Sequence, residues 1–183
     1  MRRVIWSVMT SLDGRSAAAG EGFETIDWFR ADDEWLDYSV ELLDEADTLL
    51  FGGVTFTGME QYWPMAEGPV AERMNGLEKI GFSRTARSTA WSNARIETDP
   101  VAVVGALRAG SGGAAVLMGS ANLAGTLSAR GLVDEYRFAL NPVLLGGGVP
   151  VALPGSDRVE LDLADVRRFG SGIVEMRCTP RRA

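Results

Sequence analysis

The sequence predicts an α/β domain, because short apolar runs alternate with stretches that have helical apolar spacing. Residues 114–118 form an apolar run that is too short for a helix and is typical of a buried strand. Small residues at 119–120 interrupt this run, and helical spacing follows at once, up to a C-cap signal at Gly131. The same succession of strand, small residues and helix recurs in residues 48–59. This alternation is typical of an α/β core.

The N-terminal half supports the same prediction. Apolar side chains dominate residues 3–10, which indicates the first strand. Residues 32–46 carry an apolar stripe at i, i+4 and i+7, with acids in the first turn that complement the helix dipole, and so predict a helix. Residues 48–51 indicate a buried strand and residues 54–59 the short helix after it. Residues 69–77 have the pattern of a further short helix.

The second half adds mainly strands. Residues 78–83 indicate one strand, and Trp91 marks a short one. A helix is expected over residues 100–109, because proline is favoured at a helix start, where its missing N–H would be unpaired anyway.

The last part of the chain predicts three more strands, over residues 136–145, 159–163 and 173–178, with a glycine-rich hairpin turn at residues 170–172. An extension of the second strand to Phe169 is the alternative. No repeat, linker or low-complexity segment divides the sequence. We therefore expect residues 1–183 to form a single domain.

Composition excludes several classes of function. The 183 residues carry a net charge of −7, which argues against a nucleic-acid surface. The chain has no histidine and a single cysteine, Cys178, so His-ligated metals, Ser-His-Asp chemistry and intramolecular disulfides are excluded, and no metal is expected. Lys79 is the only lysine and follows Glu78, so there is no P-loop. Carboxylates or a bound cofactor must carry any chemistry.

Hydropathy indicates a protein of the cytoplasm. The apolar run at residues 4–9 is too short for a signal peptide, and no run approaches the ~20 apolar residues of a membrane span. A lone cysteine fits a reducing compartment. We expect no membrane partner.

The two strand-to-helix turns suggest a ligand that carries phosphate. A helix that starts directly after a strand points free N–H groups and a positive end at whatever lies above the strand. Thr55 stands near one such start and Ser120 at the other, so a dinucleotide with two phosphates would suit the pair. Ser83 and Arg84 follow a third strand and could hold a phosphate monoester. The alternative is a set of plain tight turns in an α/β core.

The order of these segments resembles the dihydrofolate reductase-like superfamily and is most similar to the reductase domain of bacterial riboflavin biosynthesis, the RibD C-terminal domain family. The resemblance spans most of the chain and is most specific between Gly131 and Gly148. The matching motifs are Ser11-Leu12-Asp13-Gly14, residues 46–56, Phe82-Ser83-Arg84-Thr85, residues 116–123 and residues 131–148. It implies a three-layer fold, with a mixed, mainly parallel sheet flanked by helices, and NADPH as the cofactor.

The resemblance also implies where the cofactor binds. Its phosphates would face the start of the second helix, its adenosine 2′-phosphate would lie at the end of a neighbouring strand, and its pyrophosphate would lie in the later turn. The cofactor-binding residues so implied are, in that order, Gly52, Gly53, Val54 and Thr55; Ser83 and Arg84; and Gly119, Ser120, Ala121 and Asn122.

A substrate would sit between the first strand, near Trp6 and Met9, and the first helix. In dihydrofolate reductases a carboxylate early in that helix holds the heterocycle, and by helix start the match is Asp33, with Asp37 one turn on as the alternative. Helix capping explains Asp33 equally well. Asp13, within the motif near the nicotinamide, is a further candidate for substrate binding.

Two positions depart from the family pattern. Gly53 stands where the family usually has arginine, which removes a phosphate contact, and Arg15 stands where the riboflavin-pathway reductases often have lysine. Arginine cannot donate a proton. The first hypothesis is an NADPH-dependent reductase of a small pyrimidine- or pterin-like heterocycle, similar to 5-amino-6-(5-phosphoribosylamino)uracil reductase. The alternative is a non-catalytic nucleotide-binding protein of the same fold.

Assembly is the last expectation. Residues 141–153 are apolar and carry no charge, which in a monomer would invite aggregation. Related reductases commonly pair through their C-terminal strands. We therefore expect a homodimer with this segment and the strands after it at or near the interface.

Overall fold

A computed structural model describes residues 1–20, 23–152 and 158–181. The strands are β1 (Val4–Ser11), β2 (Arg15–Ala17), β3 (Ala46–Gly52), β4 (Glu78–Phe82), β5 (Ala94–Glu97), β6 (Ala114–Met118), β7 (Glu135–Asn141), β8 (Val149–Pro150), β9 (Leu161–Arg168) and β10 (Val174–Pro180). The helices are α1 (Asp33–Asp44), α2 (Gly53–Tyr62), α3 (Pro69–Gly76), α4 (Pro100–Ala109) and α5 (Ala121–Ser128), with short 3-10 turns η1 (Phe23–Ile26) and η2 (Trp63–Met65).

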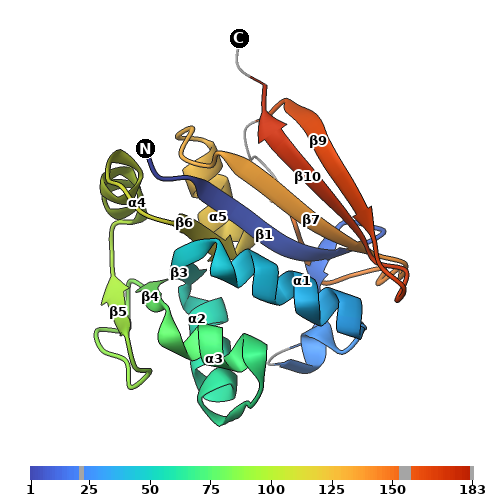
Figure 1. Cartoon of the computed structure of the whole chain (residues 1–183), viewed down its shortest axis with the longest axis horizontal. Coiled ribbons are helices and arrows are strands. Elements are labelled where there is room, and N and C mark those ends of the chain that lie inside the picture. The colour runs from blue at the N-terminus through green and yellow to red at the C-terminus, as the bar shows by residue number, and fades with distance from the viewer. Residues whose placement is uncertain (21–22, 153–157, 182–183) are drawn as a thin grey trace.

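One large sheet organises the molecule. Its strand order is β5-β4-β3-β6-β1-β7-β10-β9, and β2 pairs separately with β8. In this order each strand from β5 to β7 is parallel to the next one. Strand β10 is antiparallel to both β7 and β9. In Figure 1 the β9–β10 hairpin forms one flank of the sheet. The mixed, mainly parallel sheet expected from the sequence is confirmed.

Helices cover both faces of this sheet, which confirms the three layers. On one face α1, α2 and α3 pack on alternate side chains of the central strands, among them Ile5, Leu49 and Val116. On the other face α4 and α5 pack on the intervening side chains, such as Leu50 and Leu117. These five side chains are 0% exposed. Full burial of such a side chain contributes roughly 1.5–3 kcal/mol to the stability of the fold, so the two cores hold the helices on the sheet.

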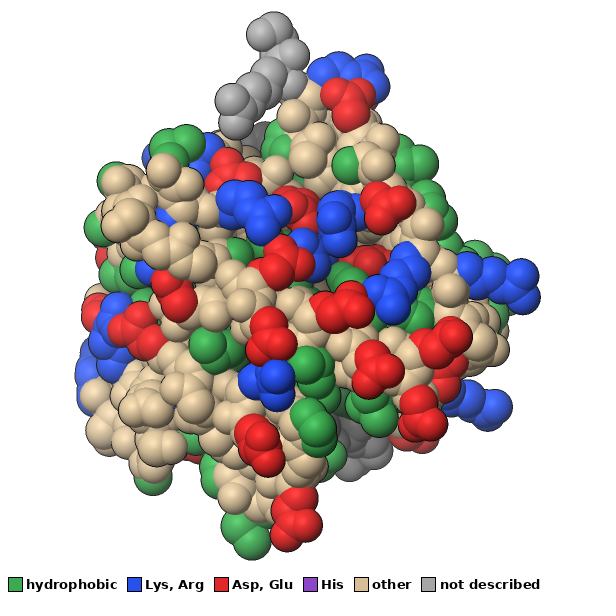
Figure 2. All heavy atoms as spheres, in the orientation of Figure 1, with side chains coloured by type: hydrophobic (Ala, Val, Ile, Leu, Met, Phe, Trp, Pro, Cys, Tyr) green, Lys and Arg blue, Asp and Glu red, His purple; other side chains and the backbone are tan. Residues whose placement is uncertain are grey.

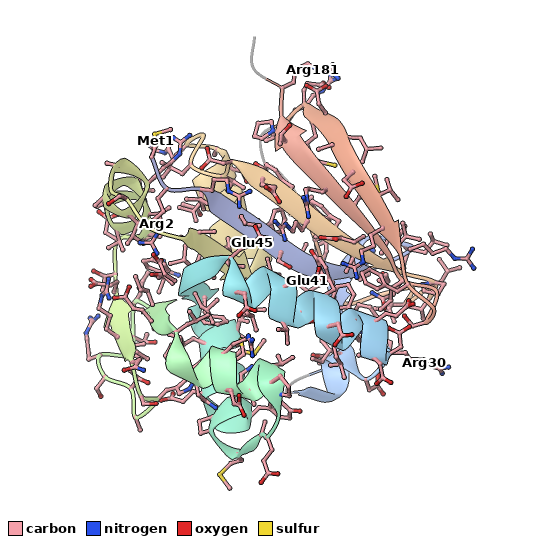
Figure 3. The ribbon with its side chains drawn as sticks, viewed as in Figure 1. Met1, Arg2, Arg30, Glu41, Glu45 and Arg181 are labelled. Carbon is pink, nitrogen blue, oxygen red and sulfur yellow. The ribbon has the colours of Figure 1, made fainter. Side chains whose placement is uncertain are left out.

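Helix α1 shows how local sequence sets an element. The carboxylate of Asp32 caps it by accepting a hydrogen bond of 2.9 Å from Trp35 N. Tyr38 and Leu42 lie on the buried stripe that faces the sheet. Glu45, the C-cap residue, lies at the C-terminal end of α1 (Figure 3). Its carboxylate accepts a hydrogen bond of 3.0 Å from the guanidinium of Arg137. A charged contact thus fixes the C-terminal end of α1 over β7.

Lys79 on β4 is 0% exposed. Its ammonium donates hydrogen bonds to the carbonyl oxygens of Met74, Asn75 and Leu77, at 3.0, 2.8 and 2.6 Å. These carbonyls lie at the C-terminal end of α3, where helix carbonyls otherwise lack partners. Burial lowers the pKa of Lys79 to about 8. The side chain therefore holds α3 against the sheet.

Several boundaries differ from the expectation. Trp91 belongs to no strand: it is buried against Phe51 and Phe56, and the strand begins three residues later at Ala94. Its side chain packs in the core, although its backbone pairs with no strand. The strand expected over residues 136–145 ends at Asn141, because the chain then turns to bond the loop after β1. The β2–β8 pair was not anticipated, since its partners are far apart in sequence.

Candidate functional site

Parallel strands bring the predicted cofactor segments to one edge of the sheet. Gly52 ends β3, Ser83 follows β4 and Gly119 follows β6. Because β4, β3 and β6 are adjacent and parallel, these three points lie at the same carboxyl edge. Ligands of open α/β sheets bind outside this edge. The structure therefore brings together three segments that are separated by 30 or more positions in the sequence.

The turn between β6 and α5 is bonded to the start of α2. Gly119 and Ser120 both adopt left-handed backbone conformations, with φ of +58° and +56°. The hydroxyl oxygen of Ser120 accepts a hydrogen bond of 2.9 Å from Gly52 N and lies 3.0 Å from the hydroxyl of Thr55. A left-handed serine costs about 1–2 kcal/mol, which these contacts help to offset. The two strand-to-helix turns therefore form one structure.

Both helix starts lack side-chain caps. Gly52, the N-cap of α2, has no side chain, and Ser120, the N-cap of α5, makes no capping bond because its hydroxyl faces Gly52. The first N–H groups and the positive ends of both helices are therefore free to bind an anion. Ala121 is buried and offers only its backbone, whereas Val54 and Asn122 are exposed. A pyrophosphate could bind between these ends.

The segment after β4 lies beside the start of α2. Ser83 Oγ accepts hydrogen bonds from Thr85 N at 3.2 Å and Ala86 N at 3.0 Å, which shapes the turn that carries Arg84. A Cβ at Gly53 would lie 3.5 Å from Ser83 Cβ. That is an ordinary contact distance, whereas the same Cβ would lie 3.3 Å from Phe82 O, so glycine at position 53 relieves a tight approach to the end of β4. The Arg84 side chain is exposed and forms no ion pair among the residues that the structure describes.

Trp6 and Met9 lie on opposite faces of the sheet, so only Met9 lies on the side where a substrate between the first strand and the first helix was expected. Positions an odd number apart on a strand point to opposite sides. Trp6 packs on the α5 face, and its indole donates a 2.7 Å hydrogen bond to Gly119 O. Met9 packs on the α1 face beside Tyr38. Trp6 therefore supports the turn at Gly119, and only Met9 faces α1.

Asp33 and Asp37 do not reach the region between α1 and β1. The helix turns Trp35 and Tyr38 toward the sheet, which leaves both carboxylates exposed on its outer side. Figure 2 shows acidic side chains across the face of the molecule that carries α1. Both carboxylates thus lie outside the region where the substrate was expected, and the catalytic role of Asp33 and the alternative at Asp37 stay predictions. The neighbouring Asp32 provides the cap.

A buried polar group that the sequence did not reveal lies under α1. Tyr38 donates a hydrogen bond to Glu175 of β10, and both side chains are buried. Burial raises the pKa of both groups. On the same face, Arg137 bonds Glu135 at 2.5 Å. Tyr38 and Glu175 are separated by 137 positions, so no local pattern could have paired them.

Asp13 connects two loops through hydrogen bonds to its carboxylate. Its carboxylate accepts hydrogen bonds from Ser11 Oγ at 2.6 Å, Leu145 N at 3.0 Å and Gly146 N at 2.8 Å. These bonds, that from Ser11 first, lower the pKa of Asp13 to about 2. The carboxylate therefore joins the loop after β1 to the loop after β7, and the role in substrate binding expected for Asp13 stays a prediction.

These two loops pair along their length. Leu12 N donates to Val143 O at 2.8 Å, Val151 N donates to Gly14 O at 3.0 Å, and β2 pairs with β8 between them. Gly148 has a φ of +102°, and a Cβ there would lie 2.1 Å from a backbone oxygen of the other loop, so only glycine fits. The paired loops stand beyond the carboxyl ends of β1 and β7.

The described part of the chain contains no group of three or more Asp, Glu, His or Cys side chains arranged to hold a metal ion. Within the same residues, no helix has the length and apolar character needed to cross a membrane.

The eight-stranded sheet, its helical layers and its edge of strand-to-helix turns define an α/β protein of the dihydrofolate reductase-like class. The sequence model of the RibD C-terminal domain family matches residues 2–175, and the chain belongs to this family.

Known proteins are similar to this chain along its whole length. The uncharacterized protein YyaP of Bacillus subtilis is 31% identical over 180 residues, covering 96% of this chain and 93% of YyaP. A crystal structure from Shewanella sp. PV-4, of a protein with a proposed role in riboflavin biosynthesis, matches with a TM-score of 0.75 at 18% identity and full coverage of both chains.

A third similar protein is larger. It is the Thermotoga maritima diaminohydroxyphosphoribosylaminopyrimidine deaminase/5-amino-6-(5-phosphoribosylamino)uracil reductase, with a TM-score of 0.67 at 14% identity. The match covers 98% of this chain but 57% of that protein. At such identities the two solved structures establish the fold alone.

Proposed function

We propose that the protein is an NADPH-dependent reductase of a small pyrimidine- or pterin-like heterocycle, acting in the cytoplasm. One observation supports this most directly. Two uncapped helix starts, joined through Ser120, lie beside the segment that carries Ser83 and Arg84, all at the carboxyl edge of parallel strands. A ligand with a pyrophosphate and a separate phosphate monoester matches this arrangement of cationic and N–H groups.

Each of these groups has a distinct part in the proposal. When bound, NADPH supplies the hydride. The N–H groups at the starts of α2 and α5 hold the pyrophosphate, and Ser83 and Arg84 hold the 2′-phosphate. Trp6 fixes the carbonyl of Gly119 by its hydrogen bond, so the turn keeps its shape when the ligand binds. Val54 and Asn122 flank the two helix starts.

The substrate would bind on the α1 side of β1. There Met9 is half-buried beside Phe29 and Trp35, whose rings pack edge to face with centroids 5.4 Å apart. Flat apolar walls of this kind suit a heterocyclic ring. The reductase named in the T. maritima protein acts on a substituted uracil, which supports a pyrimidine as the first class to test.

The test is binding followed by turnover. Calorimetry with NADPH and NADH measures which cofactor binds, and we expect NADPH to bind more tightly. Steady-state NADPH oxidation is then followed with a panel of pyrimidines and pterins. Binding of neither cofactor would contradict the proposal, whereas oxidation with a member of the panel would identify the substrate class.

A second candidate is a non-catalytic nucleotide-binding protein. Two observations favour it. Position 53 is glycine where the family usually has arginine, and the exposed carboxylate of Asp33 lies outside the proposed substrate region. NADPH binding without turnover of any heterocycle in the panel would support this candidate over the reductase.

We also propose that the protein forms a homodimer through its C-terminal strands. On β9, the edge strand of the large sheet, Leu163 and Val166 are 58% and 51% exposed, and in the separate β2–β8 pair Val149 is 45% exposed. Exposed apolar side chains on an edge strand are typical of an interface between copies. The apolar segment that the sequence suggested, residues 141–153, forms part of the paired loops, and its last residue lies outside the described ranges.

A further inference from the structure

The segment that carries Arg84 runs beside α2 and is held at both ends. At its start, Ser83 lies against Gly53, the first residue of α2. At its end, residues 89–91 contact Glu60, in the last turn of the same helix. Gly53 and Glu60 are seven residues apart, which is about 10 Å along a helix. The segment therefore follows α2 from its N-terminus to its last turn.

Glu60 makes the second attachment. One oxygen of its half-buried carboxylate, Oε1, accepts hydrogen bonds from Thr89 Oγ1 at 2.5 Å, Ala90 N at 2.9 Å and Trp91 N at 3.2 Å. Bonds to an ionised acceptor are about twice as strong as neutral ones. Trp91 is buried in the core, so Glu60 joins the segment where it enters the protein interior.

The part between the two attachments has little support of its own. Residues 84–88 are exposed, and within the described ranges the side chains of Arg84 and Arg87 form no hydrogen bond or ion pair. The position of Arg84 relative to the starts of α2 and α5 therefore depends on where the ends are held. Holding a binding segment in its bound arrangement before the ligand arrives reduces the entropic cost of binding.

We propose that Glu60 is a positioning residue for recognition of the adenosine 2′-phosphate, and that it acts through the segment 83–91 without touching the ligand. This inference rests on the proposed NADPH site. It assigns to α2 two tasks: its first turn faces the pyrophosphate, and its last turn sets the reach of Arg84. Selectivity for NADPH over NADH then depends on a carboxylate in the last turn of α2, seven residues from the helix start that faces the pyrophosphate.

Two substitutions at Glu60, with a matched control, test the proposal by calorimetry with NADPH and NADH. Glu60→Ala removes all three bonds, and we expect the Kd for NADPH to rise at least about fivefold, or ~1 kcal/mol, while that for NADH stays within about twofold. Glu60→Gln keeps an oxygen that accepts the same bonds and should retain NADPH binding. Glu67→Ala, an exposed position, makes the same charge change and should leave both Kd values unaltered.

The outcomes separate this inference from the proposed function. Equal weakening of NADPH and NADH by Glu60→Ala would show a general support of the helix and overturn the inference. The inference would also be overturned if Glu60→Ala left NADPH binding unchanged while Arg84→Ala weakened it. If the unsubstituted protein binds neither cofactor, the proposed function fails and this inference fails with it. Thr89→Val removes the bond that Thr89 donates to Glu60 and the one that Trp91 N donates to Thr89 Oγ1, and leaves the bonds from Ala90 N and Trp91 N to Glu60. It replaces Glu60→Ala if thermal denaturation shows that variant to be unfolded, with the same selective loss expected.

Discussion

Arg84 carries the clearest expectation for a single side chain. An ion pair or hydrogen bond to a charged group contributes roughly 1.5–3 kcal/mol, so Arg84→Ala should weaken NADPH binding by about tenfold or more. NADH lacks the 2′-phosphate and should bind almost as before. Calorimetry with both cofactors measures the difference, and Arg130→Ala, at an exposed position just beyond α5, is the charge-matched control. Equal losses for both cofactors would contradict the assignment.

Asp13 gives an expectation for pH. Its folded-state pKa, about 2, lies below the ordinary value of 3.8, so its contribution to holding the paired loops is present above pH 3.8 and is lost as the pH falls toward 2. The amide protons of Leu145 and Gly146 donate to this carboxylate. Their NMR chemical shifts should therefore titrate with a midpoint near pH 2. A midpoint near 4, the value of a free aspartate, would show that these bonds are not formed in solution.

Side chains also mark the limit of inference from sequence. The Ser-x-Asp-Gly pattern indicated a turn at Asp13, but its partners at Leu145 and Gly146 are more than 130 positions away, so its structural role was hidden. The pairing of Tyr38 with Glu175 was hidden for the same reason. The opposite orientation of Trp6 and Met9, in contrast, follows from strand alternation and was available from the sequence itself.

Among the elements, the turn between β6 and α5 is the most sensitive. A leucine at Ser120 would place a branched side chain between two helix starts and remove the contact with Gly52. Ser120→Leu should abolish NADPH binding and lower the free energy of unfolding by about 1–2 kcal/mol, from the lost hydrogen bond and the left-handed backbone. Thr126→Leu, exposed on the same helix, is the control. Complete unfolding of Ser120→Leu in a thermal melt would show that the residue serves the fold alone.

Elements with a strong local pattern were predicted well. The strand-to-helix units at β3–α2 and β6–α5 follow from apolar spacing and small residues, and the structure has them at the expected positions. Elements that depend on a distant partner were not: β2 and β8 are three and two residues long and exist only through each other. Trp91 was mistaken for part of a strand because buried aromatic residues occur in loops as well as in strands.

For the assembled protein, sedimentation equilibrium at micromolar concentration tests the proposed dimer. We expect a mass near twice 19.7 kDa. Val166→Asp on β9 and Val149→Asp on β8 place a charge among exposed apolar side chains and should shift the mass toward the monomer. Thr98→Asp, exposed near the opposite edge of the sheet, should leave the mass unchanged. A monomeric mass for the unsubstituted protein would refute the dimer.

The burial of Lys79 has a practical consequence for handling the protein. It is the only lysine in the sequence and is 0% exposed, so the folded chain offers no lysine amine to acylating reagents. Acylation of Lys79 requires α3 to detach from β4 and the ammonium to leave its three carbonyl partners. The rate at which mass spectrometry finds this one residue modified therefore reports opening of the core directly. The chain carries its own chemical probe of unfolding, and no substitution is needed to install it.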